Sequence, residues 1–291
     1  MDQKIINLYD TFTHGGMSRR EFMDRLTALA GSTAAAMALL PLLQNDYAKA
    51  AIVPADDRRL HAETISYDSP KGKVKGYLVR LKGTVRRPAI VVIHENRGLN
   101  PHLEDVARRL AVSGFLALAV DLLSVSGGTP ADEDKAREVH EKTNREDMIA
   151  EAVAAVTYLK SHPESTMKVG AIGFCFGGGV VNRMATDSPD LLAAVPYYGA
   201  QPPADKVPAI KAALLLHYAE KDDNINKGIA AFEEALKANK KNYTKYIYQG
   251  AQHAFNNDTN AARYNKPQAD LAWGRTLAFF RQHIGIPPNE A

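Results

Sequence analysis

The sequence feature that most constrains the fold is the run Gly173-Phe174-Cys175-Phe176-Gly177-Gly178. It follows the apolar segment Val169-Gly170-Ala171-Ile172 and sets the only cysteine of the 291-residue chain in the frame G-x-C-x-G. This frame is typical of a nucleophile elbow, a sharp strand-to-helix turn with small residues on either side. A lone cysteine outside such a frame is more often a small buried hydrophobe. The glycine frame therefore favours Cys175 as a nucleophile.

Strand and helix patterns alternate from about residue 55 to residue 288, which predicts one α/β domain. Residues 61–67 and 76–81 alternate as two antiparallel strands would. Continuous apolar runs, typical of parallel strands buried on both faces, cover 89–94, 116–120, 169–172, 193–198 and 212–218, with a further strand at 245–248. Helical patterns cover 103–113, 132–143, 145–161, 178–186, 229–239 and 269–284. The chain is thus expected to form a mostly parallel sheet with helices on both faces.

The first fifty residues differ from the rest of the chain. Ser18-Arg19-Arg20-Glu21-Phe22-Met23 holds a twin arginine, the weakly polar run 26–43 follows, and Ala48-Lys49-Ala50 comes next. This order predicts a twin-arginine export signal cleaved after Ala50, and with it a periplasmic or otherwise exported protein without stable membrane insertion. The alternative is a helical arm over residues 1–50 that stays on a cytoplasmic protein.

Composition excludes several classes of protein. The formal net charge of +3 is small and dispersed, so no nucleic-acid partner is expected. A single cysteine excludes an intramolecular disulfide framework, and the nine histidines form no H-x-H or H-E-x-x-H motif. The glycines 177–179 fit neither the G-x-G-x-x-G nor the Walker frame. We therefore expect neither a metal nor a cofactor; the oligomeric state is left open.

Candidate catalytic residues follow four of the predicted strands. Because the carboxyl ends of parallel strands meet at one edge of the sheet, Glu95, Cys175, the pair Asp222-Asp223 and His253 are expected to lie close together. The order nucleophile, acid, histidine is the one that α/β-hydrolases use. We expect Asp222 rather than Asp223 as the acid because of its distance from the strand.

These residue types define a chemical hypothesis. The helix after Cys175 stabilises a thiolate, and His253 can take the thiol proton and return it to a leaving group. Asp222 would orient the imidazole. The backbone N–H groups of Phe176 and Asn96 would form an oxyanion hole, in which each donor contributes about 3 kcal/mol. His94 and His217, at strand ends, are expected to be hydrogen-bonded supporting residues.

At these residues the chain resembles the dienelactone hydrolase family, or carboxymethylenebutenolidases, over roughly residues 60–285. The resemblance rests on the Cys175 elbow, the Glu95 loop, Asp121-Leu122, Asp222 and the run Gly250-Ala251-Gln252-His253-Ala254-Phe255. It implies a cofactor-independent Cys-His-Asp hydrolase of a small-molecule ester or lactone, acting through a thioester. It also implies that Glu95 takes the thiol proton when substrate arrives. Without the resemblance, Glu95 reads as a loop carboxylate paired with Arg97.

The chain departs from this family where substrate is held. The best-known members bind the substrate carboxylate with arginines, one of them shortly after the catalytic histidine, whereas Asn256-Asn257-Asp258 stands here. Arg97, Arg137 and Arg145 are the candidates to replace it. Two alternatives follow: a general short-chain esterase with a neutral substrate, and a thiol redox sensor on the same scaffold.

Overall fold

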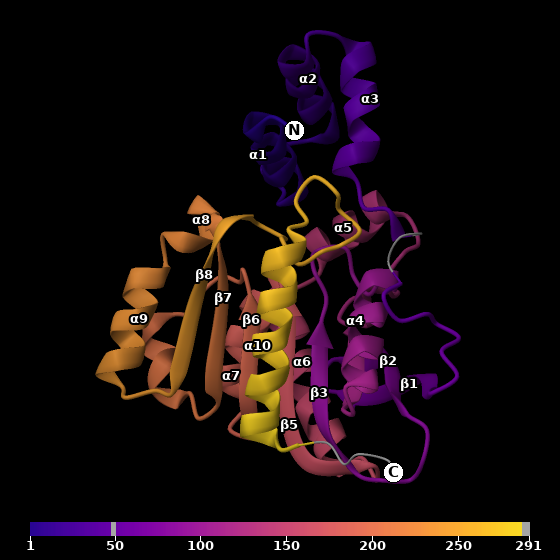
Figure 1. Ribbon diagram of the computed structural model, residues 1–291, viewed down its shortest axis with the longest axis vertical. Coiled ribbons are helices and arrows are strands. Elements are labelled where there is room, and N and C mark those ends of the chain that lie inside the picture. Colours follow the sequence, from indigo (N-terminus) through magenta and orange to yellow (C-terminus); the bar gives the residue numbers. More distant parts are fainter. Residues whose placement is uncertain (48–50, 287–291) are drawn as a thin grey trace.

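The computed structural model describes residues 1–47 and 51–286, which form an α/β domain with a helical arm on one end (Figure 1). The predicted cleavage site at Ala48-Lys49-Ala50 lies outside the described residues, as do residues 287 and 288 at the end of the predicted domain. The arm stands over the end of the sheet toward which the arrow of β3 (Arg87–Ile93) points. That end is the one at which the candidate catalytic residues were expected.

Eight strands form one sheet in the order β1-β2-β4-β3-β5-β6-β7-β8. The antiparallel pair β1–β2 is confirmed, with Leu60 opposite Leu81 and Ser69 opposite Gly72. β2 also pairs antiparallel with β4, and every other neighbouring pair is parallel. The strands are β1 (Leu60–Ser69), β2 (Gly72–Leu81), β3 (Arg87–Ile93), β4 (Leu116–Asp121), β5 (Ser165–Phe174), β6 (Leu191–Tyr197), β7 (Ala213–Lys221) and β8 (Tyr243–Gln252).

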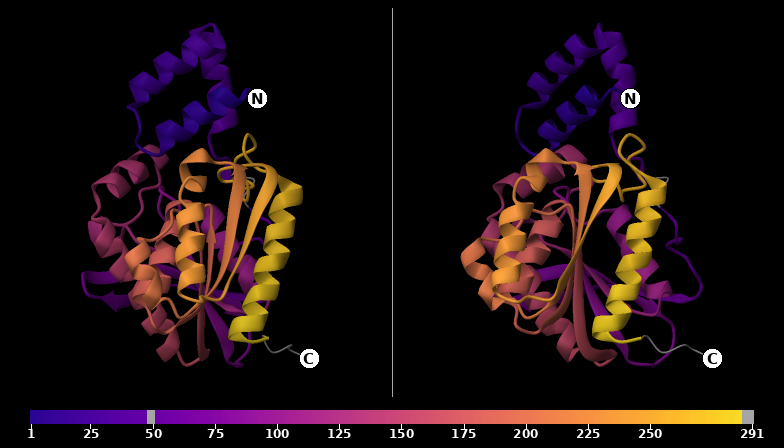
Figure 2. Two further views of the ribbon diagram at one scale, coloured as in Figure 1. Left: turned by 90° about the vertical axis from the view of Figure 1, so that its left-hand side faces the viewer. Right: turned by 60° about the vertical axis from the view of Figure 1, so that its left-hand side comes forward.

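Helices cover both faces of this sheet, as the alternating pattern predicted (Figure 2). One apolar layer packs α4 and α10 on the sheet, and the other packs α6, α7 and α9. β3 and β4 are buried along their whole length, as expected for strands covered on both sides. The α-helices are α4 (Pro101–Val112), α5 (Glu133–Lys142), α6 (Arg145–Ser161), α7 (Phe176–Asp187), α8 (Asp223–Asn226), α9 (Ile229–Ala238) and α10 (Lys266–Ile284), with short 3₁₀ turns η2 (Ser124–Ser126) and η3 (Ala204–Ala209).

The arm consists of α1 (Gln3–Thr13), α2 (Arg19–Ala30) and α3 (Thr33–Leu43). The weakly polar run 26–43 is therefore not one helix: Gly31, at φ +83°, ends α2, and Ser32 caps α3. No single helix in the described part of the chain is long and apolar enough to cross a membrane, although α2 and α3 pass that test together as a pair bent by 111°.

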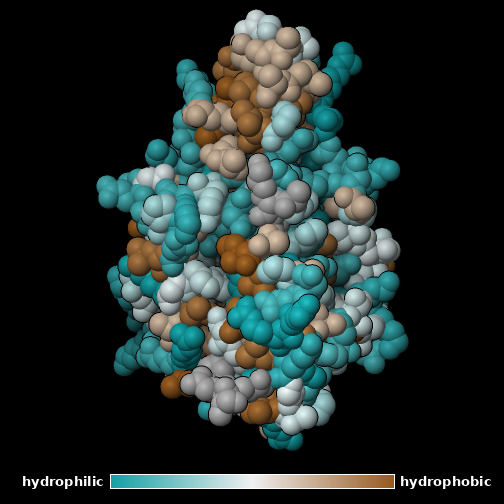
Figure 3. Space-filling view, turned by 45° about the vertical axis from the view of Figure 1, so that its right-hand side comes forward, coloured by the Kyte–Doolittle hydropathy of each residue, from teal (hydrophilic) through white to brown (hydrophobic). Residues whose placement is uncertain are grey.

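The arm has a small hydrophobic core of its own. Phe22 and Leu26 of α2 are fully buried, and Phe12 stacks on Phe22 with ring centroids 4.6 Å apart. Other large apolar side chains of α2 and α3, such as Leu29 and Met37, are exposed. Hydrophobic surface on the arm is visible in Figure 3. The three helices therefore form a packed unit rather than an extended leader.

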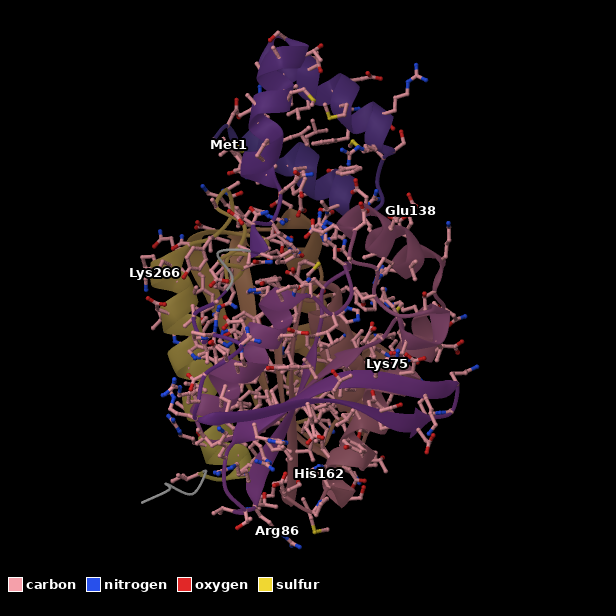
Figure 4. The ribbon with its side chains drawn as sticks, turned by 90° about the vertical axis from the view of Figure 1, so that its right-hand side faces the viewer. Met1, Lys75, Arg86, Glu138, His162 and Lys266 are labelled. Atoms are coloured by element: carbon pink, nitrogen blue, oxygen red, sulfur yellow. The ribbon has the colours of Figure 1, made fainter. Side chains whose placement is uncertain are left out.

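Polar contacts attach this arm to the domain. Asn260 Nδ2 donates to the carbonyl oxygen of Leu43 at 2.7 Å, and Arg97 donates to the Tyr9 hydroxyl at 3.0 Å. Asn96 Nδ2 donates to the carbonyl oxygen of Thr13. In Figure 4, Glu138 of α5 lies at this junction, whereas Arg86 and His162 lie at the opposite end of the domain. The arm therefore lies on the loops that carry the predicted site.

Candidate active site

Cys175 occupies a strained turn between β5 and α7. Its backbone has φ 55° and ψ −116°, a conformation that L-residues rarely adopt, and its N–H donates to the Tyr197 carbonyl at 3.1 Å. A Cβ on Gly173 would lie 2.2 Å from the Gly177 carbonyl oxygen, and one on Gly177 would lie 2.5 Å from that of His94. Glycine at these two positions is therefore a steric requirement of the turn.

His253 and Asp222 meet beside this turn. His253 Nδ1 lies 2.6 Å from Asp222 Oδ2, and both side chains are buried. Asp222 is the N-cap of α8, whereas Asp223 is the first residue of that helix and is exposed. A ring nitrogen of His253 lies within 4.8 Å of Cys175 Sγ. The structure thus brings Cys175, His253 and Asp222 together and leaves Asp223 outside.

A second histidine, which the sequence did not single out, contacts Cys175. His14 is the C-cap of α1, and its Nε2 lies 3.2 Å from Cys175 Sγ. Its Nδ1 lies 2.7 Å from the Asp10 carbonyl oxygen, and its ring meets that of His253 edge-on at 5.0 Å. No local sequence signal marks His14, because it is 161 residues from Cys175 and lies in the segment read as an export signal.

The imidazoles of His14 and His253 lower the pKa of the Cys175 thiol. Burial raises the pKa of Cys175, but the charges of His14 and His253 outweigh burial and lower the pKa to about 6. In the same way, burial lowers the pKa of His253 while the Cys175 sulfur and Asp222 raise it, with a net upward shift. The site therefore favours a thiolate beside an imidazolium at neutral pH.

Glu95 lies away from the sulfur in this structure. Its Oε2 accepts a hydrogen bond from Asn257 Nδ2 at 3.0 Å, and among the described residues it forms none with Cys175. Asn257 belongs to the stretch Asn256-Asn257-Asp258, in which the resemblance had implied an arginine. In this structure His14 contacts Sγ and Glu95 does not, and transfer of the thiol proton to Glu95 when substrate arrives stays a prediction.

The proposed oxyanion-hole groups have no competing partners within the described part of the chain. The backbone N–H of Phe176 begins α7, that of Asn96 follows β3, and neither donates to another described residue. His94 and His217 are the supporting residues expected. His94 Nε2 accepts from the Leu122 N–H at 3.1 Å, and His217 Nδ1 lies 2.7 Å from the Tyr248 hydroxyl.

A cavity of about 400 Å³ opens onto the sulfur. Arg137 and Arg145 line it, as do Phe176 and Met148. Arg137 is already paired with Glu141 at 2.9 Å, whereas Arg145 is exposed and forms no salt bridge with a described residue. Arg97 is not part of this lining.

Arg97 was a candidate to bind substrate, but its contacts lie elsewhere. Its guanidinium is buried against the arm, where it lies 3.2 Å from a Glu133 carboxylate oxygen and 3.0 Å from the Tyr9 hydroxyl. It therefore does not pair with Glu95, and it joins the arm to the domain.

One group of side chains has the composition of a metal site, although no metal motif exists in the sequence. Ligand atoms of His14, Cys175 and His253 all lie within 4.8 Å of one another. Imidazole nitrogen and thiolate sulfur are the donors that Zn²⁺ prefers. The three residues are brought together only by the tertiary fold, because they come from the end of α1, the β5–α7 turn and the end of β8.

The sheet order and the elbow define an α/β-hydrolase. Within that class the chain belongs to the Dienelactone hydrolase family, whose profile matches residues 74–284. A second profile, described as YqhI-like, matches residues 1–31. The arm segment that carries His14 thus matches a profile separate from that of the hydrolase domain.

Relatives and solved structures agree with this assignment. A "Putative carboxymethylenebutenolidase" from Saccharolobus solfataricus is 32% identical and covers 75% of this chain and 97% of its own. A "Putative hydrolase fragment YghX" from Escherichia coli is 50% identical over 112 residues, which are 38% of this chain and 96% of that one. The crystal structure of a "Putative Dienelactone Hydrolase" from Klebsiella pneumoniae is 26% identical with a TM-score of 0.69, covering 77% of this chain and 99% of that one.

Alkylation of the single cysteine tests the ionisation of the site. Because the thiol pKa is lowered to about 6, the rate of iodoacetamide labelling in the presence of a chelator is expected to reach half its plateau near pH 6 and to change little from pH 7 to 8. The same chain unfolded in urea is the control, with a rate that keeps rising toward the ordinary thiol pKa. A folded protein whose rate rises tenfold per pH unit up to pH 8 contradicts the thiolate–imidazolium site.

Proposed function

We propose that this protein is a cysteine-dependent hydrolase of esters or lactones that acts through a thioester acyl-enzyme. The observation that carries the proposal is the convergence of Cys175, His253 and Asp222 from three strand ends, with a 2.6 Å contact between the histidine and the acid. Membership of the Dienelactone hydrolase family supports the reaction class. A "Probable 2-oxo-3-(5-oxofuran-2-ylidene)propanoate lactonase" from Bradyrhizobium, 32% identical over 222 residues, supports an ester or lactone carbonyl as the target.

The reaction takes two acyl-transfer steps. The Cys175 thiolate attacks the carbonyl carbon, and the oxygen of the tetrahedral intermediate accepts hydrogen bonds from the N–H groups of Phe176 and Asn96. When the C–O bond breaks, protonated His253 gives its proton to the leaving alkoxide and a thioester remains. Neutral His253 then takes a proton from water, which attacks the thioester carbonyl carbon. The C–S bond breaks, the carboxylic acid leaves, and the Cys175 thiolate is restored beside protonated His253. In a lactone, the leaving oxygen stays attached to the acyl group.

Replacement of the nucleophile tests this proposal. Cys175→Ala is expected to lower kcat for p-nitrophenyl acetate by at least roughly 10⁴-fold, because the thioester can no longer form. Thermal unfolding of the variant serves as the control and should be close to that of the wild type, since only a sulfur at the cavity wall is lost. Activity that survives in a folded Cys175→Ala protein contradicts the assignment.

The cavity supports an anionic substrate over a neutral one. Arg145 is the cavity-lining arginine whose guanidinium forms no salt bridge with a described residue, and it lies over the Phe176 ring, 5.8 Å from its centroid. A carboxylate on the acyl group could pair with it. This arrangement favours a dienelactone-like ester over a neutral short-chain ester.

Arg145→Gln tests the charge of the substrate. For an ester that carries a carboxylate, KM is expected to rise about fivefold to tenfold, since a partly exposed ion pair contributes about 1 kcal/mol. For p-nitrophenyl acetate, KM should stay the same. Lys142→Gln, which removes one exposed positive charge near the end of α5 outside the cavity, is the matched control. Equal effects on both substrates would favour the neutral-esterase alternative.

We also infer that residues 1–47 remain on the active protein, while export through the twin-arginine pathway stays a prediction. Phe22 and Leu26 are buried in the arm's own core, and Arg19, one of the twin arginines, is bonded to Asp134 of α5. His14 would be lost by cleavage after Ala50. These contacts support the alternative of a retained arm.

N-terminal sequencing of the protein from its native host tests retention. The expected N-terminus lies before α1, so that the whole arm is present, because a folded arm attached to the domain is a poor substrate for a peptidase. The protein expressed without any export machinery is the control for nonspecific proteolysis. A native N-terminus at Ala51 contradicts retention and supports the export signal.

A further inference from the structure

We propose that His14, Cys175 and His253 form a binding site for Zn²⁺ or a similar thiophilic divalent cation, and that its occupation blocks hydrolysis. The arm supplies one ligand and the domain supplies two. Binding itself is independent of the reaction, whereas the block rests on the proposed function, because it assumes that Cys175 is the nucleophile.

The ligand atoms have nearly the spacing of a tetrahedral site. His14 Nε2 lies 3.2 Å from Cys175 Sγ, and all three ligand atoms lie within 4.8 Å of one another. Zn–N distances of about 2.0 Å and Zn–S distances of about 2.3 Å place neighbouring tetrahedral ligands roughly 3.5 Å apart. A movement of about 1 Å therefore suffices to close the site around a cation.

Both imidazoles are oriented as ligands. His14 Nδ1 donates to the Asp10 carbonyl oxygen, and His253 Nδ1 to the Asp222 carboxylate, so in each ring Nε2 is the nitrogen left to bind a cation once it has lost its proton. His253 is only 6% exposed, and its Nε2 forms no hydrogen bond with any described residue. Zinc-binding histidines are held in the same way, by an acceptor on the other ring nitrogen.

Negative charge around the three ligands favours a cation, and the cavity lets a cation reach them. The Asp10 carboxylate lies 3.5 Å from the His14 ring, and the Asp222 carboxylate contacts His253, so two carboxylates and one thiolate surround the site. The guanidinium of Arg263 lies beside Asp10, and Arg137 and Arg145 line the same cavity. The cavity of about 400 Å³ reaches all three ligands and leaves a fourth position for water. Nitrogen and sulfur donors favour Zn²⁺ over Mg²⁺ and Ca²⁺, which require oxygen ligands.

Occupation would stop the chemistry for a direct reason. Cation binding takes a lone pair from the sulfur and one from His253 Nε2, and the protons that the imidazoles or the thiol carry are released to solvent. The proposed nucleophile and the proposed base would then both be bound to the cation and could not react with substrate. Since His14 lies in the arm, the cation would also tie the arm to the domain.

Co²⁺ as a spectroscopic probe tests binding on the full-length chain, first freed of metal with a chelator. The expected result is a thiolate-to-cobalt charge-transfer band together with the intense visible bands of tetrahedral cobalt, both displaced by Zn²⁺. In His14→Ala the affinity is expected to fall by at least roughly 100-fold, because even a residue that only orients a ligand contributes 10–100-fold. His140→Ala is the matched control, since His140 lines the same cavity outside the cluster, and its affinity should change less than about twofold.

The outcomes distinguish failure of the proposed metal site from failure of the proposed hydrolase function. A cobalt spectrum without the charge-transfer band, or equal affinity in His14→Ala and the wild type, overturns the site even if the protein hydrolyses p-nitrophenyl acetate. The band in a protein without esterase activity leaves the site standing while the proposed function fails. In an active protein, loss of activity on adding Zn²⁺ and recovery with chelator support the block. Unchanged or increased hydrolysis at saturating Zn²⁺ overturns it.

Discussion

The backbone of Cys175 is held at positive φ by its neighbours, and the arrangement of the site depends on that turn. Such a conformation costs on the order of 1–3 kcal/mol and persists only where surrounding structure enforces it. Here the N–H bond to Tyr197 and the close approach of Gly177 to β3 enforce it. The turn sets the sulfur at the carboxyl edge of the sheet, at the start of α7. Every other group of the site is placed relative to that position.

The same geometry explains why much of the site could be predicted from sequence. Parallel strands end at a common edge, so residues that follow β5, β7 and β8 lie along one edge of the sheet, within reach of one another through the loops after the strands. Cys175, Asp222 and His253 each follow one of these strands, and the glycine frame marks the first of them. The strand and helix order of the domain could be read in the same way, because strands buried on both faces have continuous apolar sequences.

The rest of the site depends on contacts that no local pattern encodes. His14 reaches the sulfur only because three short helices pack on the loops after the strands, and the sequence 18–43 resembles an export signal. Arg97 follows β3 and was a candidate to bind substrate, yet its partners Tyr9 and Glu133 come from the arm and from α5. The direction of Glu95 was also not predictable, since it depends on the side chain at Asn257.

The arm therefore changes the ionisation of the Cys175 thiol, on which burial and nearby charge have opposite effects. Burial disfavours the thiolate, and a single imidazole, His253, must oppose that effect in a domain without the arm. With the arm in place, His14 adds a second imidazole at 3.2 Å, and the combined charges outweigh burial. The ring also occupies space beside the sulfur at the cavity wall. Attachment of the arm thus affects two properties of the Cys175 sulfur, its ionisation and the space beside it.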